Sequence, residues 1–187
     1  MAMGLNFLGR EKLRGVEAGV VHLLGSILGG ALVGLVLGAL GSGLELDRWR
    51  VWIVGGAAVG VMVVSLTRDH FELGRPCQVP RSWSRSMAAN IRFLSWGLML
   101  GSGVATLIPY PAYFLLLAGE ATVSPFVAAI AGGLYGLARE LPALWVLVHP
   151  VGPEKTMDVL PKLRPAWRGL NLFLGAAGSL ALILSAV

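Results

Sequence analysis

The sequence predicts an all-α fold, a polytopic bundle of transmembrane helices, and three observations support this class. Long apolar blocks alternate with short polar gaps along the chain. Of the 187 residues, 56% are hydrophobic and only 13% are charged, whereas about a quarter of the residues in a soluble domain are charged. Basic residues gather in the gaps. We therefore expect one integral membrane domain over residues 1–187, with the lipid bilayer as its surroundings.

Five apolar blocks have the length of membrane spans, because about 20 apolar residues cross the hydrocarbon core as a helix. The first block is longer than the ~7–15 apolar residues of a signal peptide, so it is expected to remain as a span. The third block is longer than one perpendicular helix needs, and a broken or re-entrant segment within it would give six membrane segments. The predicted spans cover residues 16–40, 51–67, 91–118, 125–148 and 169–187.

Lysine and arginine are unevenly divided among the gaps. The gaps at 1–15, 68–92 and 150–168 are rich in basic residues, while the gap at 41–50 has balanced charges and the turn at 119–121 has no basic residue. Cytoplasmic loops of membrane proteins collect Lys and Arg. We therefore expect the N-terminus and the 68–92 and 150–168 loops to be cytoplasmic, in a cell (inner or plasma) membrane.

Composition excludes several classes of function. The net charge of +5 lies beside the spans and no basic patch is interleaved with aromatic residues, so nucleic acid is not expected as a partner. Cys77 is the only cysteine, which excludes an intramolecular disulfide and a CxxC redox pair. No nucleotide-binding loop or catalytic triad is present. The chain is therefore not predicted to be an enzyme or to hold a cofactor.

The first span is rich in glycines four residues apart. This spacing lets another helix approach closely, because no side chain holds the two backbones apart. Two interpretations remain: packing within the bundle, and an interface with a second copy or another membrane subunit. The glycines are Gly25, Gly29, Gly30, Gly34 and Gly38.

The third block carries two prolines one residue apart, Pro109 and Pro111. Each removes a backbone donor and disfavours helix at the residue before it, so the helix should kink or break there. Interrupted helices often line the substrate sites of transporters. Thr106 and Tyr110 would then line the break. The alternative is a kinked helix with a purely structural role.

Arg139 and Glu140 lie in the inner half of the fourth predicted span. A charge inside a membrane costs about 2.5–3.5 kcal/mol or more unless it is paired or hydrated. Adjacent helical residues point in different directions, so these two are not expected to neutralise each other. Glu17 near the start of the first span is a candidate partner for Arg139. The charges form either an ion or proton site or a salt bridge between helices.

His22 in the first span and His149 at the end of the fourth are the candidates for ligating a haem or a metal. No CxxCH or HExxH motif accompanies them. The alternative is that both are packing or interfacial histidines.

The run from Gly97 to Leu147 resembles the second half of the CcdA/DsbD transmembrane family, within the LysE-like transporters. The similarity lies in a glycine-rich helix start, the broken segment Thr106-Leu107-Ile108-Pro109-Tyr110-Pro111, and the helix Gly132-Gly133-Leu134-Tyr135-Gly136-Leu137-Ala138-Arg139-Glu140-Leu141-Pro142. The resemblance implies a transporter-type scaffold. That family uses one cysteine in each half, and the corresponding stretch here has none, so its dithiol chemistry is not carried over.

Three functions follow from these features. The first is a small-solute transporter or exporter, suggested by the broken third block and the charges at 139–140. The second is a non-catalytic subunit of a larger membrane complex, suggested by the small size and the glycine-lined helix faces. The third is a redox protein carrying haem or another cofactor on the histidines.

Overall fold

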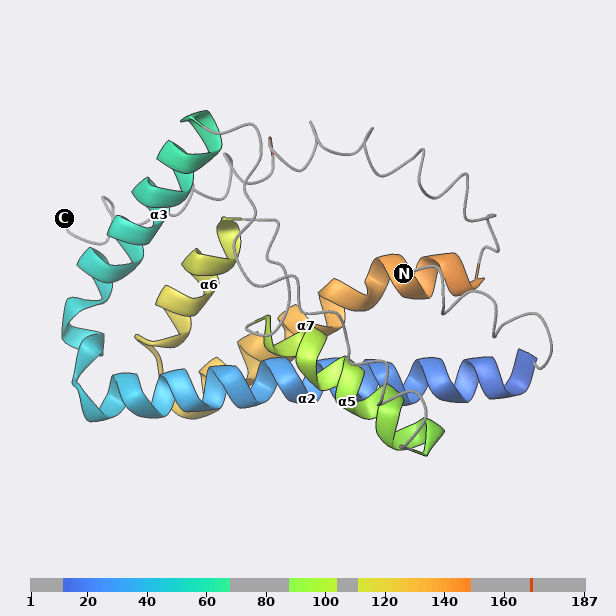
Figure 1. Cartoon of the computed structure of the whole chain (residues 1–187). Helices are drawn as coiled ribbons and strands as arrows, with labels where there is room; N and C mark the ends of the chain where they lie inside the picture. Colours follow the sequence, from blue (N-terminus) through green and yellow to red (C-terminus); the bar gives the residue numbers. More distant parts are fainter. Residues whose placement is uncertain (1–11, 68–87, 104–110, 149–168, 170–187) are drawn as a thin grey trace.

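Helix α2 (Lys12–Gly43) is the longest described element, and two of the other helices lie against it, while the remaining ones rise away from one end (Figure 1). The computed structural model describes residues 12–67, 88–103, 111–148 and 169, and these residues form helices with no strand among them. The other elements are the 3-10 helix η1 (Leu46–Trp49) and the helices α3 (Arg50–Thr67), α5 (Ala89–Ser102), α6 (Ala112–Glu120) and α7 (Pro125–Val148).

The predicted blocks at 16–40, 51–67 and 125–148 are each a single helix, namely α2, α3 and α7. Two helical stretches are long and apolar enough to cross a membrane, Glu17–Gly43 and Leu46–Thr67. The fifth predicted block, 169–187, lies outside the described residues apart from Gly169.

Helix α2 packs on its two sides against α5 and α7. Along α7 the pairs of close residues run in opposite order, from His22 with Glu140 to Gly34 with Ala128, so the two helices are antiparallel. Along α5 the residue numbers rise together, since Gly29 lies beyond Gly25 and meets Leu98 rather than Leu94, so these helices are parallel. These relative directions are the ones that alternating spans require.

The space beside the glycines of α2 is occupied by other helices of the same chain. A Cβ at Gly25 or Gly29 would meet the backbone of α5, and one at Gly30 or Gly34 would meet the backbone of α7. A Cβ at Gly38 would meet Pro125 at the start of α7. Helices approach this closely only where no side chain intervenes. The structure therefore matches the packing interpretation of the glycine-rich face.

The third predicted block is two helices rather than one. Helix α5 ends at Ser102, and Gly103 follows with a φ of 66°, a left-handed conformation that glycine adopts without strain. Helix α6 begins at Ala112, directly after Pro111. With 14 and 9 residues, each is shorter than the ~20 that a span needs. The third block is therefore interrupted, as predicted, and helix α5 already ends at Ser102, before the two prolines.

Helix α3 does not fold back along α2 but leaves its end steeply and runs beside α6 (Figure 1). The side chain of Arg50, the first residue of α3, is bonded to the carbonyl of Thr122 in the turn between α6 and α7. Because this contact fixes the start of α3 at α6, the described helices differ from a simple bundle in which each span packs on the one before it.

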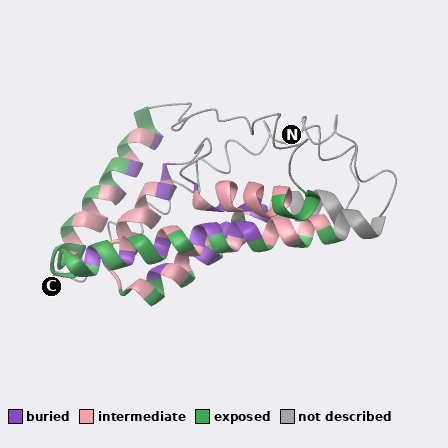
Figure 2. Cartoon of the chain, turned by 60° about the horizontal axis from the view of Figure 1, so that its bottom comes forward, coloured by how far each residue is buried: buried purple, intermediate pink, exposed green. Residues whose placement is uncertain are grey.

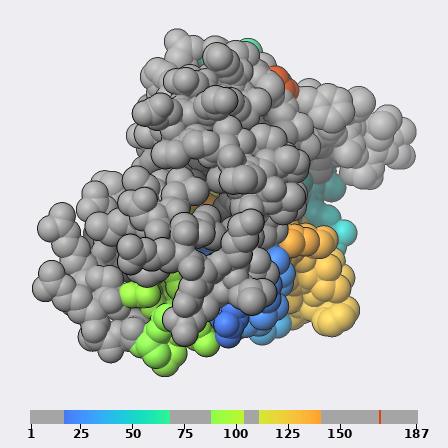
Figure 3. Space-filling view, turned by 90° about the vertical axis from the view of Figure 1, so that its right-hand side faces the viewer, coloured from blue at the N-terminus to red at the C-terminus, as the bar shows by residue number. Residues whose placement is uncertain are grey.

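The large apolar side chains of α2 point outward while its small residues point inward. Buried residues gather where α2, α5 and α7 pack together (Figure 2). On one face of the molecule the surfaces of these three helices lie next to one another (Figure 3). The exposed large apolar residues of α2 recur mostly four apart and are Val20, Leu24, Leu28, Leu32, Leu35, Val36 and Leu40.

Candidate functional site

A histidine and a glutamate join α2 to α7 inside the helix group. Nε2 of His22 lies 3.3 Å from Oε2 of Glu140, and the two side chains are 19% and 6% exposed. Nδ1 of His22 lies 3.1 Å from the carbonyl oxygen of Phe93 on α5. The imidazole ring of His22, which belongs to α2, therefore contacts both α5 and α7.

The partners of the ring determine where its protons are. A carbonyl oxygen only accepts hydrogen bonds, so Nδ1 of His22 must carry a proton and donate it to Phe93. Nε2 faces a carboxylate oxygen. Both atoms are acceptors when they carry no proton, so they form a hydrogen bond only if a proton is bound to one of them. The pair is then either imidazolium with carboxylate or imidazole with carboxylic acid. Wherever Nε2 of His22 and Oε2 of Glu140 are hydrogen-bonded, a single proton lies between them.

The surroundings of this pair are closely packed. The ring of Trp96 meets His22 edge-on, with 6.2 Å between the ring centroids. One turn along α2, the fully buried hydroxyl of Ser26 donates to the carbonyl of Gly136 at 3.0 Å. A Cβ at Gly101 would collide with the backbone of Ser26. Small residues therefore let α5 and α7 approach α2 and keep the polar atoms buried.

Arg139 faces away from Glu140, as their adjacency predicts. Its Nη1 donates to the hydroxyl of Tyr135 at 2.9 Å, and the ring of Tyr135 packs on that of Tyr113 with centroids 4.7 Å apart. The Tyr113 hydroxyl donates to the carbonyl of Ser102 at 2.7 Å, at the end of α5. This second polar group links α5, α6 and α7.

The pairing of Arg139 with Glu17 stays a prediction, and the hydrogen bond described for Arg139 is the one to Tyr135. Glu17 is exposed on α2, and the acidic side chain that bridges α2 and α7 in the described residues is Glu140. The sequence alone did not single out His22 as its partner, because the relation between the two helices was unknown. The i, i+4 spacing of His22 and Ser26 on the glycine-rich face was the available signal.

The other predicted residues are placed as follows. Pro111 caps the start of α6, whereas Thr106, Pro109, Tyr110, Cys77 and His149 lie outside the described residues. Both ring nitrogens of His22 face protein atoms, so a haem or metal would have to displace one of these contacts. Across the described ranges, no group of three or more His, Cys, Asp or Glu side chains is placed to hold a metal ion.

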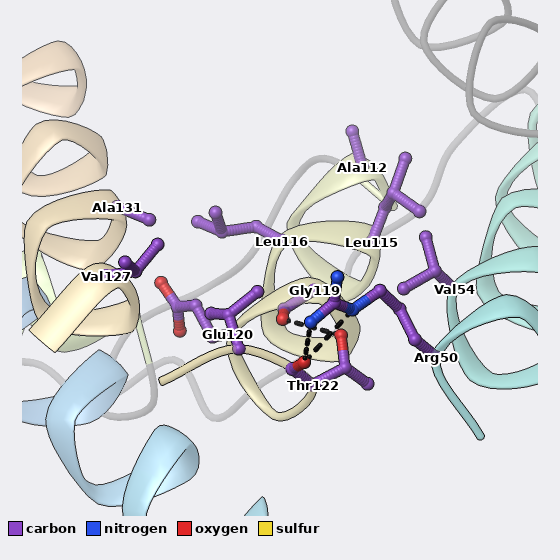
Figure 4. A pocket seen from close by; sticks show the side chains of 11 residues that line it. Arg50, Val54, Ala112, Leu115, Leu116, Gly119, Glu120, Thr122, Val127 and Ala131 are labelled. Atoms are coloured by element: carbon purple, nitrogen blue, oxygen red, sulfur yellow. Dashed lines mark hydrogen bonds between the residues drawn. The ribbon is translucent and has the colours of Figure 1, made fainter. Parts of the chain in front are cut away.

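A cavity of about 430 Å³ lies between α3, α6 and α7 (Figure 4). Glu120, at the end of α6, lines it and is 2% exposed. Its carboxylate extends toward Val127 and Ala131 of α7, while Arg50 lies on the α3 side (Figure 4). In the described part of the chain, Oε2 of Glu120 has no hydrogen-bond partner. In the sequence, this residue is distinguished only by its place in the tight turn at 119–121.

No family model, curated protein or solved structure matches this chain. The similarity to the CcdA/DsbD family therefore stays a prediction from the sequence.

Proposed function

We propose that this chain is a polytopic membrane protein of the transporter type, which moves a small solute across the bilayer together with protons. The observation that carries the proposal is the 3.3 Å contact between Nε2 of His22 and Oε2 of Glu140, two groups that can exchange a proton, at the point where α2, α5 and α7 meet. Titratable residues inside membrane helices mark proton relays and substrate pathways in many transporters.

The distribution of side chains supports a lipid environment. Large aliphatic residues cover the outer side of α2, and glycine, serine and histidine lie on its inner side. A water-soluble protein seldom exposes so continuous an apolar surface, whereas membrane helices put large apolar residues toward lipid and small or polar residues toward other helices. This arrangement agrees with the predicted membrane domain.

A movement of the helices around His22 and Glu140 would change the protonation of the pair. Moving α7 relative to α2 would separate Nε2 of His22 from Oε2 of Glu140 and change which form of the pair is favoured. Arg139, on the opposite side of α7, is tied to Tyr135 and through the tyrosine rings to α6. A movement of α7 therefore affects both polar groups, which couples protonation to rearrangement of the helices.

The test is solute-driven proton movement in liposomes. The purified chain is reconstituted with a pH-sensitive dye inside, and small organic cations, amino acids and organic anions are added outside in turn. At least one class should move protons above the level of empty liposomes. Glu140→Gln should abolish this signal, and Arg139→Ala should reduce it strongly. Glu45→Gln, which alters an exposed carboxylate paired with Arg48, serves as the matched control.

Two results would overturn the proposal. One is the absence of solute-driven proton movement for every class, with protein of native fold in the liposomes. The other is a signal in Glu140→Gln equal to that of the wild type.

A second candidate function is a non-catalytic subunit of a larger membrane complex. The outward face of α3 favours it, because a Cβ at Gly56 or Gly60 would meet nothing within 4 Å and the neighbouring Trp52, Val59 and Val63 are exposed. Extraction from the native membrane in mild detergent, followed by size analysis, tests this function. Another protein in a fixed ratio supports it, and a lone chain or a homodimer contradicts it.

A further inference from the structure

We infer that the cavity between α3, α6 and α7 binds a small organic cation, with an ammonium group on Glu120 and an apolar body against the cavity walls. This inference names the solute class of the transport proposed above and rests on that proposal for its role in movement. Binding itself does not require transport, so the two are tested separately.

The unsatisfied carboxylate is the first reason. Glu120 is almost fully buried, and Oε2 makes no hydrogen bond among the described residues. A buried acceptor without a partner costs about 1–3 kcal/mol, and more if it is charged. A proton or a bound cation removes this cost. Oε2 itself has almost no exposed surface, but the carboxylate is directed toward Val127 and Ala131, which also line the cavity (Figure 4). A ligand whose head group moves these wall side chains slightly aside can therefore supply the missing donor.

The walls define the rest of the ligand. Apart from Glu120 and two polar residues at the α3 and turn sides, the cavity is lined by aliphatic side chains and glycine, including Val54, Leu115, Leu116 and Val127. Its volume lies within the range of about 300–1,000 Å³ that holds small molecules. Such walls bind an alkyl body better than a hydrated metal ion, which would keep polar ligands around it.

Arg50 also lines the cavity, and its position explains why an anion is not favoured. Both Nε and Nη2 of Arg50 already donate to the carbonyl oxygen of Thr122, at 3.1 and 2.8 Å. The residue is exposed, so water and salt screen its charge. Glu120 is buried, and its charge acts through a less polar medium. The buried carboxylate therefore dominates the electrostatics of the ligand site.

The experiment is calorimetric titration of the full-length chain in lipid nanodiscs at about pH 8, where a carboxyl group is expected to be ionised. The probes are n-butylammonium, 1-butanol and butanoate, which share a body and differ in head-group charge. Titration of empty nanodiscs is subtracted. We expect saturable binding of n-butylammonium and binding at least about tenfold weaker for the other two, as the loss of a charged hydrogen bond implies.

Three variants test the site. Glu120→Gln should weaken n-butylammonium binding at least about tenfold, and Glu45→Gln should leave it unchanged. Ala131→Phe keeps the carboxylate and fills the cavity, so it should abolish binding. This second route keeps the inference testable if Glu120→Gln fails to fold.

The inference is overturned if Glu120→Gln or Ala131→Phe binds n-butylammonium as the wild type does, if 1-butanol binds equally well, or if butanoate binds more tightly. Absence of n-butylammonium binding to the folded wild type also overturns it, while solute-driven proton movement would survive that result. Conversely, binding without any such movement supports the site and contradicts the transport proposal.

Discussion

Arg50 donates two hydrogen bonds, from Nε and Nη2, to the backbone carbonyl oxygen of Thr122. This contact joins the start of α3 to the turn between α6 and α7, which are 72 residues apart in the sequence. The two segments therefore meet at one end of the described helices. The bond also closes one side of the cavity that Glu120 lines.

Removing this contact should loosen α3. Arg50→Ala leaves the Thr122 carbonyl without its charged donor, and we expect a loss of about 1.5–3 kcal/mol in the free energy of unfolding. SDS-induced unfolding in mixed micelles, followed by tryptophan fluorescence, measures it. Arg48→Ala is the matched control, since its exposed pair with Glu45 is worth about 0–1 kcal/mol. Equal effects of the two variants would contradict the bridging role of Arg50.

The glycines of α2 should tolerate no side chain. Gly30→Ala brings a Cβ against the backbone carbonyl of Gly132, so α2 and α7 must separate, and we expect destabilisation of about 2 kcal/mol or more. Gly60→Ala on α3 meets nothing within 4 Å and should stabilise its helix by about 0.5–1 kcal/mol. The same unfolding measurement compares them, and a neutral Gly30→Ala variant would show that the packing of these helices is loose.

We expect Gly103 to be required for stability for two separate reasons. Its φ of 66° disfavours any other residue, and a Cβ there would lie 2.5 Å from the ring and hydroxyl of Tyr113. We expect Gly103→Ala to destabilise by about 1–2 kcal/mol from the backbone alone, with more from the ring contact. Gly119→Ala, which meets nothing within 4 Å, is the control. Adding Tyr113→Leu should relieve part of the loss, and no relief would mean that only the backbone matters.

The stability of the chain should depend on pH through Glu120, which lies in the turn between two predicted spans. Burial raises the pKa of this carboxyl group from 4.5 to about 7. The folded chain therefore prefers the protonated form. Its stabilising contribution is complete below about pH 4.5 and is lost as the pH rises through about 7. Nearby charged or titratable groups are Arg50 in the cavity wall and Tyr113 and Tyr135 beside it.

Melting temperatures at about pH 5 and about pH 8 check this dependence. The wild type should lose more stability on going to the higher pH than Glu120→Gln does, with about 2–4 °C for each kcal/mol. The difference between the stability losses of the wild type and of Glu120→Gln is due to Glu120, because other titrating groups such as His22 are the same in both proteins. Glu45→Gln should behave as the wild type, and parallel pH curves for Glu120→Gln and the wild type would refute the assignment.

The length and composition of the apolar blocks predicted helices at 16–40, 51–67 and 125–148, and the structure has helices at 12–43, 50–67 and 125–148. These helices could be predicted because the formation of a long helix depends on local composition. The sequence also predicted that Arg139 and Glu140 would face different ways, since this follows from helical geometry alone. The partner of Glu140 could not be predicted in the same way. It depends on which turn of α2 lies beside which turn of α7, and glycines spaced four apart permit several registers.

By itself, the sequence determined that the chain is helical and apolar, where several of its helices run, and that its third block is interrupted. Only the tertiary structure decided that α3 runs beside α6 and that His22 meets Glu140. It also decided that Glu120 is buried at a cavity, with no hydrogen-bond partner for Oε2 among the described residues. The reason is physical. Helix formation depends on residues within a few turns, whereas each of these contacts brings together separate helices and depends on the close fit of distant glycines and on the bond from Arg50 to Thr122.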